Sequence, residues 1–576
     1  MSKRILSLTN RIWNIAEGGE CFCCPSDVVC AILRNRGISE DVELFKKTTL
    51  KRTMPDPFVF IDMEKAVNRF VKAINEGEKI AILGDYDVDG VSSTVLLMSF
   101  LRYLKVPYSY SIPNRMEDGY GLSIDNLRKY KDHLVVTVDC GSSSFDELSY
   151  ALSENMNVIV IDHHKMTAIP DTFAVVNPHR PDESEKYRNL CAAGMVFMFI
   201  VGINRKLREE DFYRSHALKE PDLFDYLDLV ALATVCDVMP LVDLNRAFVI
   251  AGIKTMYRRK NLGIDALINL NKISEISSDT IAFSFGPKIN AAGRLASADV
   301  SVKLLMTQNP VEAKQLAQRL DDLNKERQRL ESEMIEEAVQ GIDENLDFIC
   351  VHSNNWHVGI VGIVAGRLKE TYHKPSLVIA IDKDGKGRGS CRSVPGVDIS
   401  LIINKGIEKG IISSGGGHTA AAGFCISADK IDALIEFLKE EIKYEKSQEE
   451  LRADCYMPVK FISLDMMREL AEIGPFGNGN KHPKFVIPRV KIANAKVVGK
   501  NHIQLCLQDE QSGGLVRAIA FRSADTVLGE VISNCGEKNF VIQALGSLTV
   551  SEWNGKKRIS FILEDIADND ALNMDI

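Results

Sequence analysis

The stretch "ILGDYDVDGVSS" at residues 82–93 decides how the chain is interpreted. Asp85, Asp87 and Asp89 alternate in front of a glycine, directly after the apolar run "KIAIL". A calcium loop is disfavoured, because Leu96 stands where its closing glutamate belongs and because "KIAIL" has the pattern of a buried strand, not of an entering helix. Three like charges so close together repel one another. The triplet alone therefore leaves two alternatives, a solvated acidic turn and a cation site.

Size and composition describe an ordinary soluble protein. The 576 residues correspond to three or four domains of about 150 residues each, with 45% hydrophobic and 26% charged residues. The longest apolar stretch, 191–203, is shorter than the roughly 20 residues that span a bilayer, so we expect no membrane segment. The first residues lack the continuous apolar core of a secretion signal, and we expect a cytoplasmic location.

Cysteine usage and charge limit the possible functions. The 13 cysteines are an odd number scattered along the chain, which favours reduced thiols over a disulfide framework. The one cluster, Cys21, Cys23, Cys24 and Cys30, lacks the second spaced pair that a structural zinc site needs, so we do not predict a zinc site there. The formal net charge of -9 implies that any nucleic-acid surface is a local basic track.

The order of hydrophobic patterns predicts an α/β fold with a C-terminal all-β domain. Strands alternate with helices over 61–300, which is typical of a parallel sheet with helices on its faces. Residues 301–345 are rich in helix formers and predict a long connecting helix. A second α/β domain is expected at 346–447 and a small β-barrel at 448–576, while 1–60 form an N-terminal arm.

Three more apolar segments carry metal-type ligands at or near their ends. They are "VVTVDCGSSS" with Asp139, "VIVIDHHKM" with Asp162, His163 and His164, and "LVALATVCDVMPL" with Asp237. Singly, each has an ordinary explanation such as a helix cap or a backbone hydrogen bond. Ligands of parallel sheets bind at the carboxyl ends of the strands, however, and a buried Asp237 is costly without a partner cation. Together these clusters predict one site.

The donor set predicts divalent ions. Carboxylates with imidazoles and no thiolate motif suit Mn²⁺ or Mg²⁺ better than structural zinc. The set is larger than one ion needs, which favours two ions that share a bridging carboxylate. Such pairs, about 3.5–4 Å apart, stabilise the attacking and leaving oxygens in phosphoryl displacement. A metal pair would neutralise the three aspartates of 82–93.

These motifs carry a family resemblance. "DYDVDG", "VDCG", "DHH" and "CDVMP", in this order, resemble the four motifs of the DHH phosphoesterase superfamily, and "SSGGGHTAAAGF" at 413–424 resembles its associated DHHA1-type substrate-binding domain. With "NRMEDGYGL" at 114–122, "FGPKINAAGRL" at 285–295, "GSCRS" at 389–393 and "GPFGNGN" at 474–480, nearly the whole chain is similar to the bacterial single-stranded-DNA-specific exonucleases of that superfamily. The resemblance implies 5′→3′ degradation of single-stranded DNA to mononucleotides with Mn²⁺ or Mg²⁺, a role in DNA repair and recombination, and an OB fold for the barrel. A helicase and a single-strand-binding protein are further possible partners.

The resemblance also implies roles for the converging residues. The implied metal ligands are Asp85, Asp87, Asp89, Asp139, His163 and Asp237, and all but Asp85 are also expected to be catalytic. Asp139 is expected to bridge the ions, because its strand lies centrally among the others. His164 is also expected to be catalytic, beside the phosphate and not on a metal, and Asp162 is expected to orient the loop.

The resemblance implies substrate contacts in four of these motifs. The residues expected to make them are Arg115, Arg294, Ser390, Arg392 and His418. Ser390 and Arg392 resemble a pocket for a terminal 5′-phosphate, since a guanidinium fork fits phosphate oxygens. The glycines of "GGGH" would let backbone N–H groups approach an anion, although the segment is equally a tight turn before an alanine-rich helix.

The sequence departs from the family pattern at two places, and the barrel contacts are open. Lys288 stands where arginine is expected, and "NKH" at 480–482 departs from the expected "GNP". Candidates for stacking on bases in the barrel are Phe485, His502, Phe521, Arg522 and Trp553.

Three functions of different classes compete. The first is the single-strand exonuclease. The second is a small-substrate phosphodiesterase acting on oligonucleotides, cyclic dinucleotides or pyrophosphate, which would not require the barrel or the N-terminal arm. The third is a non-catalytic DNA-binding scaffold, which the complete set of acidic ligands disfavours.

Overall fold

The computed structural model describes residues 3–16, 25–38, 42–114, 121–443, 450–538, 540–553 and 556–571. The chain forms two compact units. The smaller contains Met1–Arg52, Leu241–Asp243 and Lys446–Ile576, and the larger contains Thr53–Pro240 and Leu244–Glu445. Among the residues described, no helix combines the length and apolarity needed to cross a membrane.

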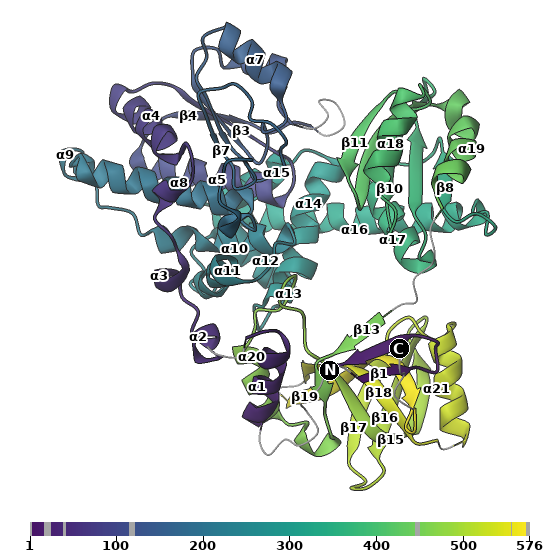
Figure 1. The fold of residues 1–576 in the computed structure, drawn as a ribbon. Coiled ribbons are helices and arrows are strands. Elements are labelled where there is room, and N and C mark those ends of the chain that lie inside the picture. Colours follow the sequence, from purple (N-terminus) through teal and green to yellow (C-terminus); the bar gives the residue numbers. More distant parts are fainter. Residues whose placement is uncertain are drawn as a thin grey trace. The chain divides into compact units, whose positions relative to one another are not determined.

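A five-stranded parallel sheet lies in the first part of the larger unit (Figure 1). Its order is β4 (Tyr108–Ser111), β3 (Ile80–Gly84), β5 (Leu134–Val138), β6 (Val158–Ile161) and β7 (Ala174–Val176). Its helices are α4 (Met63–Glu76), α5 (Val88–Leu104), α6 (Ile124–Lys129), α7 (Phe145–Ser153) and α8 (Ala192–Glu209). Strands β3, β5 and β6 are buried throughout, because α5 and α8 contact the sheet while α6 and α7 pack against its side chains. The predicted parallel sheet is confirmed.

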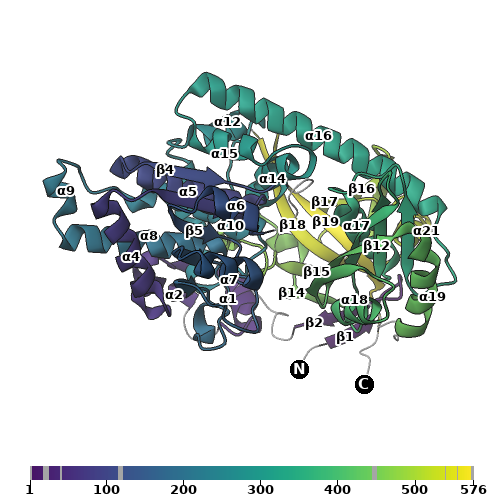
Figure 2. The ribbon, with the colours of Figure 1, turned by 90° about the horizontal axis from the view of Figure 1, so that it is seen from above.

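Helices connect the two sheets of the larger unit. They are α10 (Leu227–Cys236), α11 (Asp243–Met256), α12 (Leu262–Leu270), α14 (Gly286–Leu295), α15 (Asp299–Met306) and α16 (Pro310–Gln340). Figure 2 shows α16 running from α12 and α15 to α17 (Val361–Tyr372). The predicted connecting helix begins at Pro310 and not at 301, because Asn309 caps it and proline occupies its first turn.

The second sheet has the order β11 (Ser414–His418), β12 (Ala421–Ser427), β10 (Lys386–Arg392), β9 (Ser376–Ile381) and β8 (Ile349–Ser353). Helices α18 (Ile399–Glu408) and α19 (Ile431–Glu441) contribute to its core. The alternative of a turn before an alanine-rich helix at 413–424 is wrong, because β11 and β12 form an antiparallel hairpin. Cross-strand pairing, and Phe424 packed beneath Gly389, outweigh the helix propensity of "AAA".

The smaller unit contains a closed barrel. Strands β15 (Lys484–Val498), β16 (His502–Asp509), β17 (Leu515–Ala520), β19 (Lys556–Asp568) and β18 (Ile542–Trp553) form a ring that β18 closes against β15. Helix α21 (Val527–Lys538) joins the third and fourth strands of the chain order, as in an OB fold. Helix α20 (Leu464–Glu472) and the short strand β14 (Cys455–Tyr456) precede the ring. The predicted barrel is confirmed.

The N-terminal segment packs onto this barrel. The hairpin of β1 (Lys3–Leu6) and β2 (Ile12–Ile15) adds β13 (Glu450–Ala453) as its third strand, and α1 (Pro25–Asn35), α2 (Val42–Lys46) and α3 (Leu50–Thr53) follow. The Trp13 indole N–H donates to Asp565 Oδ2 at 2.8 Å, and the Thr9 hydroxyl donates to Oδ1 at 2.6 Å. Asp565 is fully buried, so the hairpin satisfies a carboxylate that the barrel alone would leave without these donors.

We expect Trp13→Phe to destabilise the barrel, because it removes a donor from buried Asp565 while keeping most of the ring volume. The loss should be about 2 kcal/mol, the usual scale for a hydrogen bond to a charged group. Hydrogen exchange of the β18 and β19 amides measures it. Trp356→Phe is the matched control, since the Trp356 indole donates to Glu337 at 2.9 Å in the larger unit. Unchanged exchange in the barrel of Trp13→Phe would contradict the role of this bond.

Candidate metal centre

The converging acidic and imidazole residues follow three adjacent strands of the parallel sheet. Asp85 follows β3, Asp139 follows β5, and the Asp162–His163–His164 run follows β6. These strands are neighbours and run in the same direction, so their carboxyl ends lie at one edge. Asp237 joins them from the C-cap of α10.

The loop after β3 is a helix start. Asp87 caps α5 by accepting from the backbone N–H groups of Asp89 at 2.9 Å and Gly90 at 3.1 Å. A Cβ on Gly90 would lie 2.5 Å from the Asp85 carbonyl oxygen, so only glycine fits this turn. The acidic triplet is therefore packed into the fold, and the alternative of a solvated turn does not describe it.

Asp89 is held by another helix. Its two carboxylate oxygens accept from the backbone N–H groups of Ala192 at 2.7 Å and Ala193 at 2.8 Å, in the first turn of α8. Such amides partly compensate a buried negative charge. Burial still raises the pKa of Asp89 above its ordinary value.

His163 lies at the centre of the carboxylates. Its Nε2 is 3.3 Å from Asp139 Oδ1, 3.5 Å from Asp89 Oδ2 and 3.5 Å from Asp237 Oδ2. Three groups bring ligand atoms within 4.8 Å of one another: Asp85–Asp87–Asp139, Asp139–His163–His164 and Asp89–His163–Asp237. Asp139 belongs to two of these groups, and so does His163.

Burial and mutual repulsion disfavour negative charge in this cluster. Burial, followed by the nearby charges of Asp89 and Asp87, raises the pKa of Asp139 well above its ordinary range. The same causes raise the pKa of Asp237 to about 8. Asp139 Oδ1 and Asp237 Oδ2 are buried and accept no hydrogen bond from any residue that the structure describes. A cation that ligates these oxygens would supply the missing interaction.

Asp162 orients the histidine loop. Its Oδ1 accepts from the backbone N–H of His163 at 2.7 Å and contacts His164 Nδ1 at 2.8 Å, while Oδ2 accepts from the Ser142 N–H at 3.1 Å. Burial is the largest single effect and opposes ionisation of both groups, but their hydrogen bond, their mutual attraction and the neighbouring charges together outweigh it. These interactions lower the pKa of Asp162 and raise the pKa of His164 to about 9. In the metal-free cluster this shift favours the protonated imidazole of His164.

Sequence reasoning missed Asn177 and His179, which follow β7. Asn177 Nδ2 donates to Ser142 Oγ at 2.7 Å and to the His164 carbonyl at 2.9 Å, and His179 Nδ1 lies 2.6 Å from the His163 carbonyl. Both residues fix the backbone of the histidine loop through its carbonyl groups. The only signal was polar "NPH" at the end of a fourth parallel strand.

Ser390 and Arg392 meet the first turn of α17. Both lie on one face of β10, and Arg392 Nη1 donates to Ser390 Oγ at 3.1 Å. A Cβ on Gly362 would lie 3.1 Å from Ser390 Oγ and 3.3 Å from Arg392 Nη2. A guanidinium, a hydroxyl and a helix N-terminus together suit an anion.

The other predicted substrate residues have varied surroundings. Arg294 Nη1 donates to the Gly359 carbonyl at 3.2 Å, next to α17. Lys288 is buried and pairs with Asp321 of α16 at 3.1 Å, so it braces a helix. His418 is exposed at the end of edge strand β11. Arg115 lies outside the described residues.

The barrel candidates divide by burial. Phe485 is 1% exposed and belongs to the barrel core, so its prediction as a stacking residue is wrong; its side of β15 faces inward. Phe521 is 52% exposed, and its ring contacts His502 edge-on with centroids 5.4 Å apart. The Arg522 N–H donates to His502 Nδ1 at 2.9 Å. The Trp553 side chain lies outside the described part of the chain.

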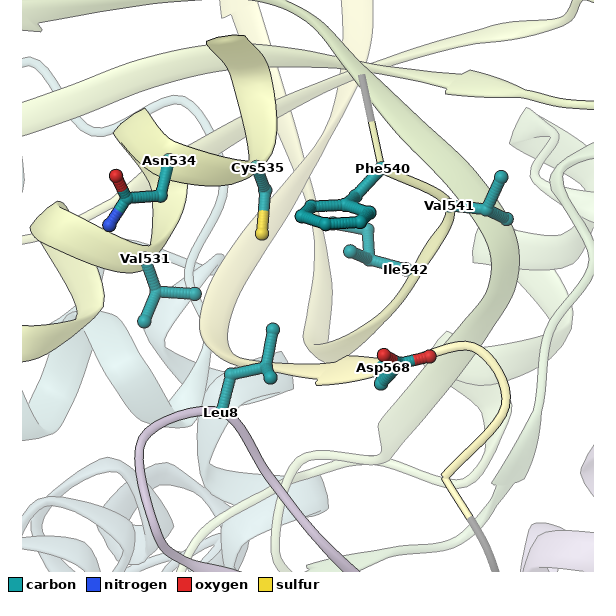
Figure 3. Close-up of a pocket in the computed structure, with 8 residues that line it drawn as sticks. All are labelled: Leu8, Val531, Asn534, Cys535, Phe540, Val541, Ile542 and Asp568. Atoms are coloured by element: carbon teal, nitrogen blue, oxygen red, sulfur yellow. The ribbon is translucent and has the colours of Figure 1, made fainter. Parts of the chain in front are cut away.

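The smaller unit also contains a hollow of about 290 Å³ between α21, β18 and the N-terminal hairpin (Figure 3). Its lining is mainly apolar and comprises Leu8, Val531, Asn534, Cys535, Phe540, Val541, Ile542 and Asp568. With one carboxylate and a Cys535 thiol whose pKa is raised by burial, it lacks the chemistry of a competing active site.

Comparisons with known proteins agree with this arrangement. The chain matches models of the DHH family N-terminal domain over 79–234, the DHHA1 domain over 345–444 and the RecJ OB domain over 453–565. It is 33% identical to the single-stranded-DNA-specific exonuclease RecJ of Haemophilus influenzae over 85% of this chain and 88% of that protein. It is 31% identical to RecJ of Bacillus subtilis over 94% of this chain and 68% of that protein. The crystal structure of Thermus thermophilus RecJ in complex with Mn²⁺ superimposes with a TM-score of 0.79 at 25% identity, covering 98% of this chain and 80% of that one.

We expect Asp139→Asn to raise the melting temperature of the metal-free protein at pH 8 by a few degrees. Asparagine tolerates the left-handed backbone of Asp139, φ 62°, and removes one of several repelling charges. The pKa of Asp139 is higher in the folded than in the unfolded protein, so its ionisation lowers the free energy of unfolding. This loss is absent below the unfolded pKa of about 4 and grows as pH rises above it. The gain should therefore shrink at pH 5. Thermal melts in EDTA measure both.

Asp62→Asn is the matched control for this substitution. Asp62 also has a left-handed backbone, φ 63°, but it pairs with Arg180 at 2.8 Å. Removing this charge should lower the melting temperature. A lower melting temperature for Asp139→Asn at pH 8 would contradict the repulsion.

Proposed function

Because the chain belongs to the RecJ family of single-stranded-DNA-specific exonucleases, we propose that it hydrolyses single-stranded DNA from the 5′ end to mononucleotides, in DNA repair and recombination. One observation carries the proposal. Carboxylates from α5, the end of β5 and the end of α10 gather around His163, and two of their buried oxygens lack donors within the described chain.

The cluster fits two divalent ions. Carboxylates with one or two imidazoles suit Mn²⁺ or Mg²⁺, and Mn²⁺ is the ion in the Thermus thermophilus structure. The proposed ligands are Asp85, Asp87, Asp89, Asp139, His163 and Asp237. Asp139 is the proposed bridge, because it alone joins the Asp85–Asp87 group to the histidine group. When bound by these residues, two such ions would supply stabilisation of charge on the attacking and leaving oxygens of the phosphodiester.

The chain's own residues orient the reaction. The α8 amides fix both oxygens of Asp89, and Asp162 fixes the ring of His164. His164 lies beside Asp139 with its ring held by Asp162, so we assign it to charge on the phosphate that is cleaved. Asp162 uses its carboxylate on Ser142, His163 and His164 and is assigned to positioning, not to a metal.

The 5′ end is assigned to Ser390, Arg392 and the first turn of α17. These groups share one small region of the second sheet and offer a guanidinium fork, a hydroxyl and helix amides. A terminal phosphomonoester carries more negative charge than an internal phosphodiester, so this region favours an end. Arg294, Arg115 and His418 are assigned to the strand that follows.

The exposed Phe521 ring, in contact with half-buried His502, gives the barrel a surface on which bases can stack. This pair favours a long single strand over the small-substrate phosphodiesterase, whose ligand would not need the barrel. A non-catalytic scaffold is disfavoured by the complete ligand set. The proposed location is the cytoplasm. A helicase that exposes single strands and a single-strand-binding protein that coats them are the proposed partners.

We expect a 5′-phosphorylated single strand to be digested from its 5′ end in Mn²⁺, while a blunt duplex resists. Asp139→Asn should lower turnover by roughly 1,000-fold or more, since a bridging carboxylate serves both ions. Chain-length analysis of labelled products measures both. A linear dinucleotide and a cyclic dinucleotide are assayed in parallel. Hydrolysis of these with the long strand untouched would favour the small-substrate enzyme, and binding without cleavage would favour the scaffold.

We expect Arg392→Ala to weaken hydrolysis of 5′-phosphorylated strands by roughly 10- to 100-fold, the scale of a lost hydrogen bond to a charged group. The same strand with a 5′-hydroxyl should lose much less. Arg388→Ala is the matched control, because Arg388 lies exposed on the same face of β10. Equal losses on both strand ends would refute a terminal-phosphate role for Arg392.

A further inference from the structure

Asn245, in the first turn of α11, ties the segment that carries Asp237 to the segment whose amides hold Asp89. Its side chain is 2% exposed, and Nδ2 donates to the Asn189 carbonyl at 2.6 Å and to the Pro240 carbonyl at 3.1 Å. An amide NH₂ has two hydrogens, so both bonds form at once.

Each of the two carbonyls belongs to a segment that positions one carboxylate of the metal centre. Asn189 stands three residues before Ala192, whose N–H, with that of Ala193, holds Asp89. Pro240 stands three residues after Asp237. Asp89 and Asp237 are each 3.5 Å from His163 Nε2 and form one ligand group with it. Asn245 thus connects the segment that holds Asp89 to the segment that carries Asp237. These two carboxylates lie near the same nitrogen, His163 Nε2.

The turn after Asp237 is strained. Val238, directly after Asp237, has φ 57° and is 64% exposed, and a β-branched residue disfavours this left-handed backbone. The N–H groups of Val238 and Met239 bond to the carbonyls of Val235 and Thr234, and the Asn245 bond to Pro240 adds a restraint from outside the turn. Repulsion between Asp89 and Asp237 also acts to separate the two segments.

Stability alone does not explain an amide at this position. Asn245 Oδ1 is buried and accepts no hydrogen bond from the residues described. Leaving such an oxygen without a donor costs about 1–3 kcal/mol, which offsets much of what the two Nδ2 bonds contribute. The geometry that these bonds impose is the remaining role.

We propose that Asn245 is a positioning residue that sets the separation of Asp89 and Asp237 around His163, and thereby the affinity for the divalent ion bound between them. This inference rests on the proposed metal centre. Groups that orient metal ligands typically contribute 10- to 100-fold to metal affinity. The bonds themselves connect only neutral groups and leave the charge of the site unchanged.

The test is the Mn²⁺ affinity of Asn245→Ala, measured by calorimetry on the metal-free full chain. We expect about 10-fold weaker binding. In DNA hydrolysis the Mn²⁺ concentration for half-maximal rate should rise similarly, while kcat at saturating Mn²⁺ recovers most of its value. Asn245→Ser keeps one donor, should bind Mn²⁺ with intermediate affinity, and carries the test if Asn245→Ala does not fold.

Gln543→Ala is the matched control. Gln543 is 4% exposed, its Nε2 donates to the carbonyls of Asp568 at 3.2 Å and Asn569 at 3.1 Å, and its Oε1 also lacks a partner in the described chain. It should lower the melting temperature without changing Mn²⁺ affinity. Wild-type Mn²⁺ affinity in a folded Asn245→Ala, or an equal loss in Gln543→Ala, would overturn the inference. Failure of the unsubstituted protein to bind Mn²⁺ would instead refute the proposed function.

Discussion

Repulsion among carboxylates at one edge of a parallel sheet is the constraint on which the rest of the structure depends. Asp89 and Asp139 are almost fully buried, and Asp237 lies within 3.5 Å of the same imidazole nitrogen. Water does not screen charges at such depth, so the fold itself must hold them together. It does so with backbone amides at Asp89 and with a tight glycine turn at Gly90. Burial, together with the repulsion that remains, raises the pKa of Asp139 and of Asp237, and bound cations would offset both effects.

The second sheet of the larger unit is placed by close backbone contacts with this edge. A Cβ on Gly293 would lie 2.6 Å from the Tyr86 carbonyl oxygen, within the acidic loop. The next residue, Arg294, makes a similar contact: a Cβ on Gly359 would lie 2.3 Å from the Arg294 carbonyl oxygen. The chain of contacts therefore runs from the acidic loop through α14 to the segment before α17, which meets Ser390 and Arg392. Lys288, buried against Asp321, braces the same helix on α16. Gly293 and Gly359 thus allow the close contacts that hold Ser390 and Arg392 at a fixed place relative to the carboxylates.

The sequence predicted those features that repeat locally and failed where distant segments meet. Alternating strand and helix patterns predicted the parallel sheet, and sheet topology then brought Asp85, Asp139 and His163 to one edge. Phe485 was misjudged because alternation along a barrel strand does not say which face points inward. The hairpin at 413–424 was missed because its pairing with β10 outweighs local propensity. The docking of Trp13 on Asp565 joins residues more than 500 positions apart, and no local pattern signals it.

The residues that support the candidate ligands explain why the site was only partly visible in the sequence. Asn177 holds the His164 carbonyl, Asn290 accepts from the Val88 N–H beside Asp87, and Asn245 bridges Asn189 and Pro240. All three are neutral amides. A lysine or arginine in these places would neutralise the carboxylates and compete with the ions, whereas another acid would add to the repulsion. An amide can fix a loop through two short bonds without altering the charge that binds metal. Asparagine is also common at turns and helix caps, so its sequence context does not distinguish this role from an ordinary one.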